Sequence, residues 1–291
     1  VTWTTDGAYA GTVFYRNEKF SITNICGLLN SKTDKIINKF IFYWLQIEAK
    51  KHVKGGSGNP KLMSNIMAGI KVPIPSIETQ KKIVETLDKF TEYVTELQAE
   101  LQAELQYRTL QFNYYRDKLL SEEYLDRMSK VDLKHVEQVC LGELCEILDN
   151  QRIPISKEKR ENGIYPYYGC NGIQDWVKDY IFDGTYLLIG EDGSVLNENN
   201  TPVLHYIENK KFWVNNHAHV IRSDNKKAYL KYIYYFLSQV DISGLVKGVP
   251  PKLNQANLKS IKIIVPALKV QKDIILILDK FQDILKDTEG L

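Results

Sequence analysis

Two loops of similar make-up carry polar side chains suited to contact a polyanion. The first holds Lys54, Ser57, Asn59 and Lys61, and the second holds Lys247, Lys252 and Asn254. Lysine neutralises phosphate groups, and asparagine can form paired hydrogen bonds with adenine in the DNA major groove. Glycine and proline crowd both loops, which predicts exposed turns. Ordinary solvated loops without a ligand are the alternative.

Two further clusters combine aromatic and polar side chains. One is a turn with Tyr167, Tyr168, Asn171 and Gln174, and the other follows an expected strand, Lys211–Val214, with Asn216, His217 and His219. Both clusters could face a nucleic-acid groove, although core packing explains the tyrosines equally well. Two histidines at i and i+2 of a strand share one face. Because the spacing supplies no further ligands, we expect no metal site.

An enzymatic alternative rests on Asp192, Glu208 and Lys210, whose order imitates a Mg²⁺ nuclease core in which two carboxylates hold the metal. Against it, the Asp-Gly pair at Asp192 recurs at Asp6, where no Glu-x-Lys follows. Asp-Gly is also a common turn. A methyltransferase is not expected, since no glycine-rich loop follows a strand to hold a methyl donor. We therefore expect no catalytic residues and no cofactor.

The elements that position these residues occur twice. Asp6-Gly-Ala matches Asp192-Gly-Ser, Lys39–Leu45 matches Lys231–Leu237, and Pro60-Lys-Leu62 matches Pro251-Lys-Leu253. Gln80-Lys81 likewise matches Gln271-Lys272, and the offset stays between 186 and 193 residues. Such a conserved order indicates an internal repeat.

Each copy is predicted to contain strands, a short amphipathic helix, a glycine- and proline-rich loop, a strand ended by proline and a heptad helix. The short helices are expected at Ile36–Gln46 and Tyr229–Gln239, and a buried strand at Tyr186–Gly190. Residues 138–191 of the second copy have no counterpart in the first. We therefore expect the first copy to be part of a domain, completed by another segment or partner, or else only marginally stable.

A long helix is expected from Ile83 to about Leu125. Its apolar residues follow a heptad rhythm until Leu101, and a repeated Leu-Gln-Ala-Glu unit at 96–106 then adds a stutter. A second heptad helix, with Ile274 and Leu278, repeats the phase of the first, so the two are expected to pair. The aromatic far end could seat a partner protein or pack against the core; it comprises Tyr107, Phe112, Tyr114 and Tyr115.

Charge is unevenly distributed although the net charge is only +2. Residues 1–76 hold 10 Lys and Arg against 4 Asp and Glu, whereas residues 77–130 hold 8 against 11. This pattern suggests a polyanion at the globular parts. No apolar run is long enough to span a membrane, and the four cysteines form no Cys-x-x-Cys pair, which fits a reducing, cytoplasmic setting.

These residues resemble the specificity subunit of type I restriction-modification enzymes. The resemblance rests on the repeat, on Tyr-Pro-Tyr-Tyr-Gly-x-Asn-Gly at 165–172, on the stretch 181–194, and on a Pro-x-x-x-x-Gln-Lys-x-Ile junction at Pro75 and again at Pro266. It implies a non-catalytic subunit in which two target-recognition domains each read half of a split double-stranded DNA site. Antiparallel helices would set the gap and dock modification (methyltransferase) subunits, two by expectation, with the restriction subunit bound indirectly.

The expected fold is therefore α+β, with two β-rich recognition domains joined by helices that pair as an antiparallel coiled coil. The expected blocks are 1–76 for part of the first domain, 77–130 for the central helix, 131–266 for the second domain and 267–291 for the final helix. A coiled-coil scaffold without DNA affinity remains a third interpretation.

Overall fold

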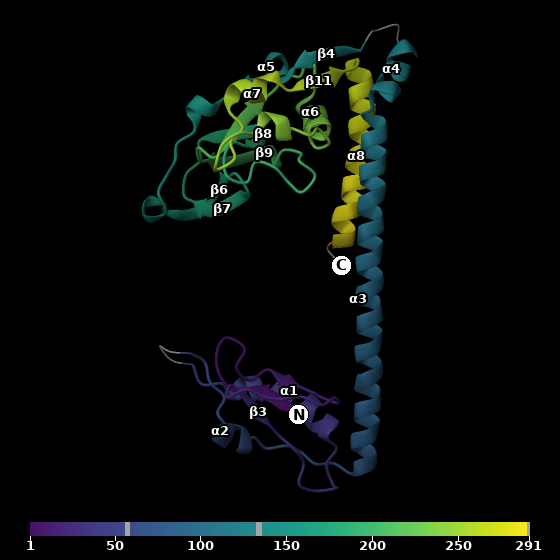
Figure 1. Cartoon of the computed structure of the whole chain (residues 1–291), viewed down its shortest axis with the longest axis vertical. Coiled ribbons are helices and arrows are strands. Elements are labelled where there is room, and N and C mark those ends of the chain that lie inside the picture. The colour runs from purple at the N-terminus through teal and green to yellow at the C-terminus, as the bar shows by residue number, and fades with distance from the viewer. Residues whose placement is uncertain (56–58, 132–135, 290–291) are drawn as a thin grey trace. The chain divides into compact units, whose positions relative to one another are not determined.

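The computed structural model describes residues 1–55, 59–131 and 136–289. The chain divides into two compact units, Val1–Gln102 and Ala103–Leu291. The division falls inside the Leu-Gln-Ala-Glu repeat and therefore within the block expected for the central helix. Figure 1 labels the helices and strands of both units.

The first unit is built on a three-stranded antiparallel sheet with the order β2-β1-β3. Trp3, Leu45 and Leu62 are among the apolar side chains of its core. Among the residues that the structure describes, no helix is both long enough and apolar enough to cross a membrane. The elements of this unit are β1 (Thr2–Thr4), β2 (Val13–Phe14), β3 (Cys26–Leu28), α1 (Asn38–Glu48), the 3-10 helix η1 (Ala49–His52), α2 (Ser64–Ala68) and the first part of α3 (Ile77–Leu119).

The second unit contains a six-stranded sheet with the order β5-β10-β8-β9-β6-β7 and a two-stranded sheet, β11-β4. All pairings are antiparallel except β6 with β9, which is parallel. The elements after α3 are α4 (Glu122–Val131), β4 (Glu137–Cys140), α5 (Leu141–Leu144), β5 (Glu146–Ile147), η2 (Asp149–Gln151), η3 (Lys157–Lys159), β6 (Asn162–Gly169), β7 (Gly172–Val177), β8 (Phe182–Gly190), β9 (Leu204–Val214), β10 (Ala218–Arg222), α6 (Leu230–Leu237), η4 (Ser243–Leu245), α7 (Gln255–Ser260), β11 (Lys262–Val265) and α8 (Leu268–Glu289).

The buried strand expected at Tyr186–Gly190 forms the inner end of β8. Leu187, Leu188 and Ile189 are fully buried because β8 lies between β9 and β10 and is covered on both faces. A strand covered on both faces tolerates a continuous apolar run rather than an alternating one. The short helices α1 and α6 likewise lie where the sequence predicts them.

A buried glutamine joins the heptad helix of each copy to the loop before its short helix. The Gln80 side chain accepts a hydrogen bond from the Ile37 amide (2.9 Å) and donates to the carbonyls of Lys35 and Pro75 (both 2.9 Å). Gln271 does the same with Tyr229 (2.9 Å), Lys227 (2.9 Å) and Pro266 (2.8 Å). Both glutamines are fully buried, so the repeat predicted from sequence extends to individual hydrogen bonds.

A second contact is also duplicated, between the short helix and the heptad helix. Lys39 and Tyr43 both contact Asp88, at 2.7 and 2.5 Å, and Lys231 and Tyr235 contact Asp279 at 2.8 and 2.5 Å. The hydrogen bond that Lys39 donates to Asp88 raises the pKa of Lys39, since a neighbouring carboxylate favours the charged ammonium form.

The long helix ends earlier than the sequence predicts. We expected one helix to about Leu125, whereas α3 ends at Leu119 and α4 begins at Glu122. The reason is Ser121, whose hydroxyl donates to the Lys118 carbonyl (2.8 Å) and accepts from the Tyr124 amide (3.3 Å). A serine at this position satisfies helix-end groups and so permits a new helix to start.

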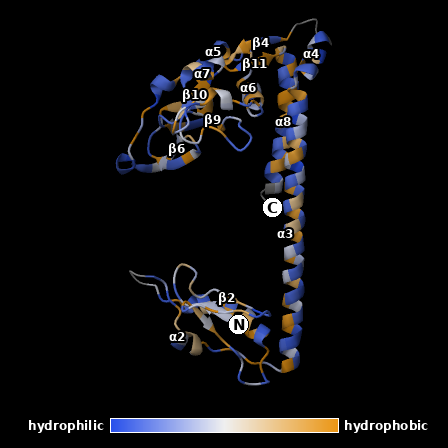
Figure 2. Cartoon of the chain, viewed as in Figure 1, coloured by the Kyte–Doolittle hydropathy of each residue, from blue (hydrophilic) through white to orange (hydrophobic). Residues whose placement is uncertain are grey.

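Within the second unit, α8 packs antiparallel against the end of α3 (Figure 1). The Tyr115 and Phe281 rings stack at 5.2 Å, and Phe112 packs against the main core. Apolar residues recur along α8 (Figure 2), and Val270, Ile274 and Leu278 are buried there. The antiparallel helix pairing and the α+β class expected from the sequence are therefore confirmed.

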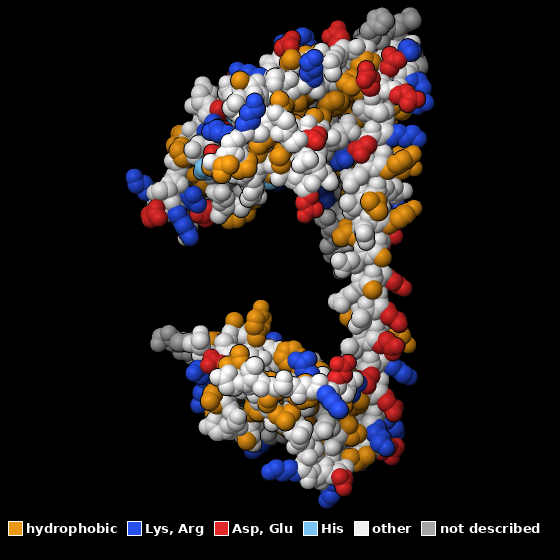
Figure 3. Space-filling model, viewed as in Figure 1, with side chains coloured by type: hydrophobic (Ala, Val, Ile, Leu, Met, Phe, Trp, Pro, Cys, Tyr) orange, Lys and Arg blue, Asp and Glu red, His pale blue; other side chains and the backbone are white. Residues whose placement is uncertain are grey.

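The two copies differ at the strand that precedes the heptad helix. In the second unit β11 pairs with β4 over four residue pairs. The counterpart segment of the first unit, 71–74, has no strand assignment. Beside it lies an apolar cavity of about 570 Å³, lined in part by Phe40, Trp44, Ile74 and Leu87. Hydrophobic side chains are visible on the surface of this unit in Figure 3. An incomplete first domain remains a prediction.

Candidate nucleic-acid interface

Both lysine-bearing loops are closed at their ends by the same backbone pairing, and we call each closed loop a hairpin. The backbone groups of Lys54 and Lys61 exchange two hydrogen bonds of 3.0 Å, and those of Lys247 and Lys252 exchange bonds of 3.0 and 2.9 Å. Ser57 lies outside the described residues. Asn59 is exposed in the first hairpin. The sequence therefore placed equivalent lysines at equivalent turn positions.

Each hairpin is fastened to the Asp-Gly turn that follows the central strand. The Gly7 amide donates to the Pro60 carbonyl, and the Gly193 amide donates to the Pro251 carbonyl, both at 3.0 Å. Gly7 and Gly193 have φ angles of +91° and +78°, which explains why glycine recurs there. The amide of Leu253 then donates to the Glu191 carbonyl at 2.8 Å. Both hairpins are thus held at their bases by backbone hydrogen bonds.

The lysines at the two ends of each hairpin differ in charge environment. Lys61 pairs with Asp6 (3.5 Å) and Lys252 pairs with Glu191 (3.1 Å). Lys54 and Lys247 are exposed. Val249, at the tip of the second hairpin, is completely exposed, which makes it an apolar contact surface that the sequence did not single out.

The aromatic-polar turn divides into core and surface residues. Tyr167 is only 1% exposed, its hydroxyl bonds to the backbone of Ile155, and the Arg160 guanidinium lies 4.2 Å from its ring centre. Tyr168 is half-buried and packs edge-on against Phe212. Both tyrosines therefore pack in the domain core, which was the alternative to base contact.

The polar members of that turn are exposed. Asn171 donates to the Ser194 hydroxyl at 3.1 Å, and Gln174 accepts from Asn215 at 3.2 Å. Asn254 is also exposed, but its side-chain oxygen caps α7 by accepting from the Asn257 amide at 2.8 Å. A capping oxygen is already used for helix stability, which weakens the case for Asn254 as a base contact.

The two histidines have separate surroundings. His217 is exposed and bonds to Asp192, next to the exposed Asn216. His219 is 1% exposed and lies between the Asp149 carboxylate (Nδ1, 2.6 Å) and the Leu253 carbonyl (Nε2, 2.7 Å). His219 is therefore an internal residue rather than a surface contact.

His219 belongs to a charged cluster, which we define as Asp149, Arg152, Glu191, His219 and Lys252. The side chains of this cluster are largely buried, except that of Lys252, which is half-exposed. Arg152 donates to Glu191 at 2.5 Å and lies 3.7 Å from Asp149. Burial acts to raise the pKa of Asp149, but the hydrogen bond and charge of His219 and the charge of Arg152 outweigh it, and the pKa is lowered. Each carboxylate thus has a cationic partner.

The same cluster supplies the grouping closest to a metal site. One donor atom each from Asp149, Glu191 and His219 lie within 4.8 Å of one another. However, Arg152 and Lys252 already contact these carboxylates. A metal ion would have to displace these cationic side chains from the carboxylates.

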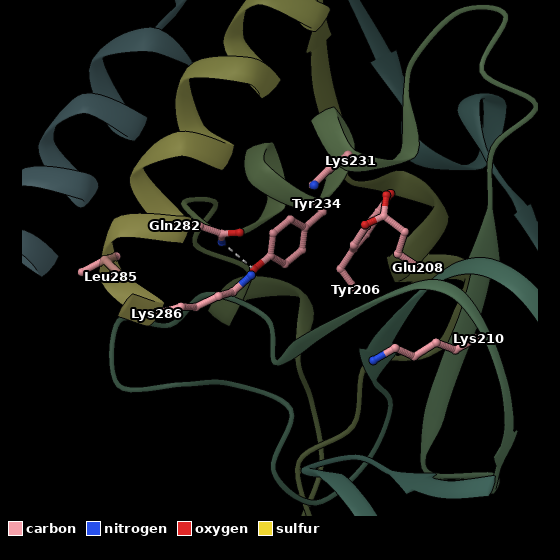
Figure 4. A pocket seen from close by; sticks show the side chains of 8 residues that line it. All are labelled: Tyr206, Glu208, Lys210, Lys231, Tyr234, Gln282, Leu285 and Lys286. Atoms are coloured by element: carbon pink, nitrogen blue, oxygen red, sulfur yellow. Dashed lines mark hydrogen bonds between the residues drawn. The ribbon is translucent and has the colours of Figure 1, made fainter. Parts of the chain in front are cut away.

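The nuclease residues are not brought together. Asp192 bonds to His217, whereas Glu208 and Lys210 line a cavity of about 510 Å³ on β9 (Figure 4). That cavity is also lined by Lys231 and Tyr234, and Asp192 is not among the residues around it. Two carboxylates must share a metal in such a site, so this geometry gives the nuclease interpretation no support.

The aromatic end of α3 also divides in two. Phe112 and Tyr115 contribute to packing with the core and α8. Tyr107 and Tyr114 are 63% and 60% exposed, and the Tyr114 ring contacts Tyr115 at 5.3 Å. Contact of Tyr107 and Tyr114 with a partner protein stays a prediction.

Comparison with known proteins decides the family. A sequence model described as "Type I restriction modification DNA specificity domain" matches residues 1–107 and 134–290. The chain belongs to this family. A type I specificity subunit of Mycoplasma pneumoniae is 31% identical over an alignment that covers all of this chain and 87% of the relative.

Other members of the specificity family match in part. A type I restriction enzyme specificity subunit of Haemophilus influenzae is 38% identical over 145 residues, which cover 50% of this chain and 37% of that protein. A further relative from M. pneumoniae is covered to 45% of its length. The chain thus spans less than half of these curated relatives.

Solved structures of specificity subunits share the fold. The S subunit from M. genitalium has a TM-score of 0.54 at 18% identity, and the match covers 99% of this chain and 79% of that one. The HsdS subunit from Thermoanaerobacter tengcongensis has a TM-score of 0.51 at 17% identity, with 87% and 64% covered. These likenesses confirm the fold class expected from the sequence.

Three residues of the charged cluster beside the second hairpin were not predicted from the sequence. Asp149, Arg152 and Glu191 act through partners far along the chain; Asp149 and His219 are 70 residues apart. Local spacing carries no signal for such contacts. The adjacency of Glu191 to the Asp-Gly turn was the only hint available.

Proposed function

We propose that the chain is a non-catalytic DNA-recognition subunit of a type I restriction-modification complex. Each copy of the repeat presents its hairpin to one half of a split double-stranded DNA site. The observation that carries the proposal is the duplicated hairpin, fastened at its base and bearing an exposed lysine, Lys54 or Lys247. Membership in the DNA specificity family supports it.

The chemistry of the hairpins, and of the exposed turns that hold Asn171, Gln174 and Asn216, suits DNA. The lysines supply phosphate contacts that position the protein without reading sequence. The exposed Asn171, Gln174 and Asn216 offer hydrogen-bonding groups to base edges. Val249 at the hairpin tip offers an apolar surface for a thymine methyl group.

The helices are proposed to act as a spacer and as a dock. The Leu-Gln-Ala-Glu repeat is part of α3 and precedes Phe112 and Tyr115, which pack within the second unit. A length change there would leave those contacts intact while altering the separation of the half-sites. The exposed Tyr107 and Tyr114 are proposed to contact modification subunits, two per complex, with the restriction subunit joining through them.

Selection from a randomised duplex library with the purified full chain tests the proposal. We expect enrichment of two short motifs separated by a fixed gap, with affinity that falls steeply as salt rises. A single continuous motif would contradict the split site. Absence of duplex binding at low salt would favour a scaffold without DNA affinity.

Insertion of one Leu-Gln-Ala-Glu unit after Glu100, which keeps the repeat in register, tests the spacer. The helix would lengthen by about 6 Å and turn by about 40°. At about 3.4 Å per base pair, the gap should grow by one or two base pairs. Gln102→Lys changes the same part of α3 without changing its length. This variant is the control and should leave the gap unchanged. An unchanged gap in the insertion variant would refute the spacer role.

A further inference from the structure

Gln174 occupies an irregular position of β7, which pairs with β6 at the edge of the six-stranded sheet (Figure 1). Tyr167 on β6 pairs with Asp175 on β7. The next residue of β6, Tyr168, pairs with Ile173, so Gln174 is the extra residue of a β-bulge. A bulge breaks the alternation of side chains along a strand and changes the direction of the extra one. Ile173 and Gln174 are accordingly both exposed, although they are neighbours in a strand.

Gly169 gives the end of the Gln174 side chain a place beside the backbone of β6. A Cβ at position 169 would lie 2.1 Å from Gln174 Nε2 and 2.4 Å from its Cδ. Glycine lacks this atom and therefore leaves room for the amide. Because the atoms in the way belong to the end of a flexible side chain, a larger residue at 169 would displace the amide rather than unfold the domain.

A backbone N–H group fixes the order of two side-chain amides that end at Gln174. The His217 amide can only donate and lies 2.8 Å from Asn215, so the accepting atom of Asn215 is Oδ1. The other end of the Asn215 side chain is then Nδ2, which donates to Gln174 Oε1 at 3.2 Å. Asn215 is only 4% exposed. Amides do not titrate at physiological pH, so this order does not depend on pH.

The amino group of Gln174 is therefore the end that remains for a ligand. Its carbonyl oxygen is engaged by Asn215, and Nε2 has no acceptor among the residues that the structure describes. A glutamine that reads adenine needs both ends, since its oxygen accepts from N6 and its amino group donates to N7. Gln174 offers donors alone.

Guanine is the base whose major-groove edge suits a pair of donors. It presents O6 and N7, two acceptors side by side. Adenine presents one acceptor beside an amino donor, thymine one acceptor beside a methyl group, and cytosine an amino donor. A group with two N–H bonds and no acceptor therefore favours guanine and disfavours cytosine.

We propose that Gln174 is a specificity-determining residue that donates from Nε2 to a guanine in the half-site read by the second unit. Asn215 is the positioning residue that sets this preference, although it is buried and does not reach the DNA itself. The inference rests on the proposed DNA-recognition function and adds to it the base that one side chain selects.

Neutron diffraction from crystals of the full chain without DNA tests the amide order, because it distinguishes an amino group from a carbonyl oxygen. We expect deuterium on Asn215 Nδ2, directed at Gln174 Oε1. Asn215→Asp leaves only acceptors at that end, so the Gln174 amide should turn over and donate to the new carboxylate. Deuterium on Gln174 directed at Asn215 in the unchanged chain would overturn the proposal.

Selection from a randomised duplex library with the full chain tests the base. One position should be guanine, and 7-deazaguanine there, which lacks the N7 acceptor, should lower affinity by about tenfold. Gln174→Glu presents an acceptor at an exposed site and should exchange this guanine for cytosine. Asn215→Asp should lose the same guanine in favour of a base with an amino group, adenine or cytosine. Gly169→Ala should displace the amide and remove the preference.

Gln138→Glu is the matched control, because it makes the same chemical change at an exposed residue of β4. It should leave the selected sequence unchanged. If a split motif is selected but none of its positions changes in Gln174→Glu, the guanine contact is refuted and the proposed function stands. If the amide order is observed but the chain selects no duplex motif, the proposed function fails and the guanine contact fails with it.

Discussion

Replacing Gln271 by methionine keeps the length of the side chain but removes three buried hydrogen bonds. The amide of Tyr229 and the carbonyls of Lys227 and Pro266 lose their partner in a site closed to water. Each such bond contributes about 1 kcal/mol net. We therefore expect the free energy of unfolding of the second unit to fall by about 3 kcal/mol, and its melting temperature by about 9 °C for a unit of this size.

Calorimetry with amide exchange measures this loss. The exchange experiment localises it, because the Tyr229 amide should lose protection before the rest of the unit. Gln106→Met makes the same chemical change at an exposed site of α3 and should shift the melting temperature little. Gln80→Met should reproduce the loss in the first unit. A loss under about 1 kcal/mol for Gln271→Met would refute the view that this glutamine fastens helix to domain.

Three further outcomes are expected. Lys247→Gln should lower the slope of log affinity against log salt by about one, and Lys252→Gln by less, because Glu191 already pairs with it; salt titrations measure both. The pKa of Asp149 is lowered from its ordinary value of 3.8. Its charged form therefore stabilises the fold above pH 3.8, and this stability is lost as pH falls through the folded pKa. In Asp149→Asn the free energy of unfolding should therefore fall less steeply with falling pH. Tyr235→Phe removes a donor to a carboxylate on α8 and should cost about 2 kcal/mol in denaturant unfolding.

Features with local or repeated signals were predictable from the sequence. The heptad helices, the buried strand ending at Gly190 and the two exposed glycine- and proline-rich loops all follow from periodicity, turn residues or the repeat. The pairing that closes these loops into hairpins was found only in the structure. Gln80 and Gln271 are the same residue type at equivalent positions of the two copies. The repeat therefore marked the two junctions at which the structure shows duplicated hydrogen bonds. A position that recurs in both copies is thus predicted from two independent stretches of sequence.

The rest depends on contacts that spacing does not encode. The end of α3 at Leu119 turns on one serine hydroxyl within an otherwise helical pattern. The surroundings of His219 depend on Asp149, which is 70 residues away. The exposed tip at Val249 depends on how the backbone around it is fastened. The i, i+2 spacing of His217 and His219 predicted that both lie on one face of a strand. In the structure they have separate partners, Asp192 and Asp149.

Trp3 on β1 lies across from Gly27 on β3, and Ile189 on β8 lies across from His219 on β10. Trp3 Nε1 bonds to the buried Leu62 carbonyl, and His219 Nε2 bonds to the buried Leu253 carbonyl. A Cβ on Gly27 would lie 2.2 Å from the Trp3 ring. These opposed pairs constrain how the two domains can be exchanged by recombination. A crossover between the two strands of a pair would combine Trp with His, which the 2.2 Å approach to the indole forbids, or Ile with Gly, which leaves a buried carbonyl without a donor. Both products would be destabilised. Viable mosaics of the two copies must therefore inherit both strands of a pair from the same parent.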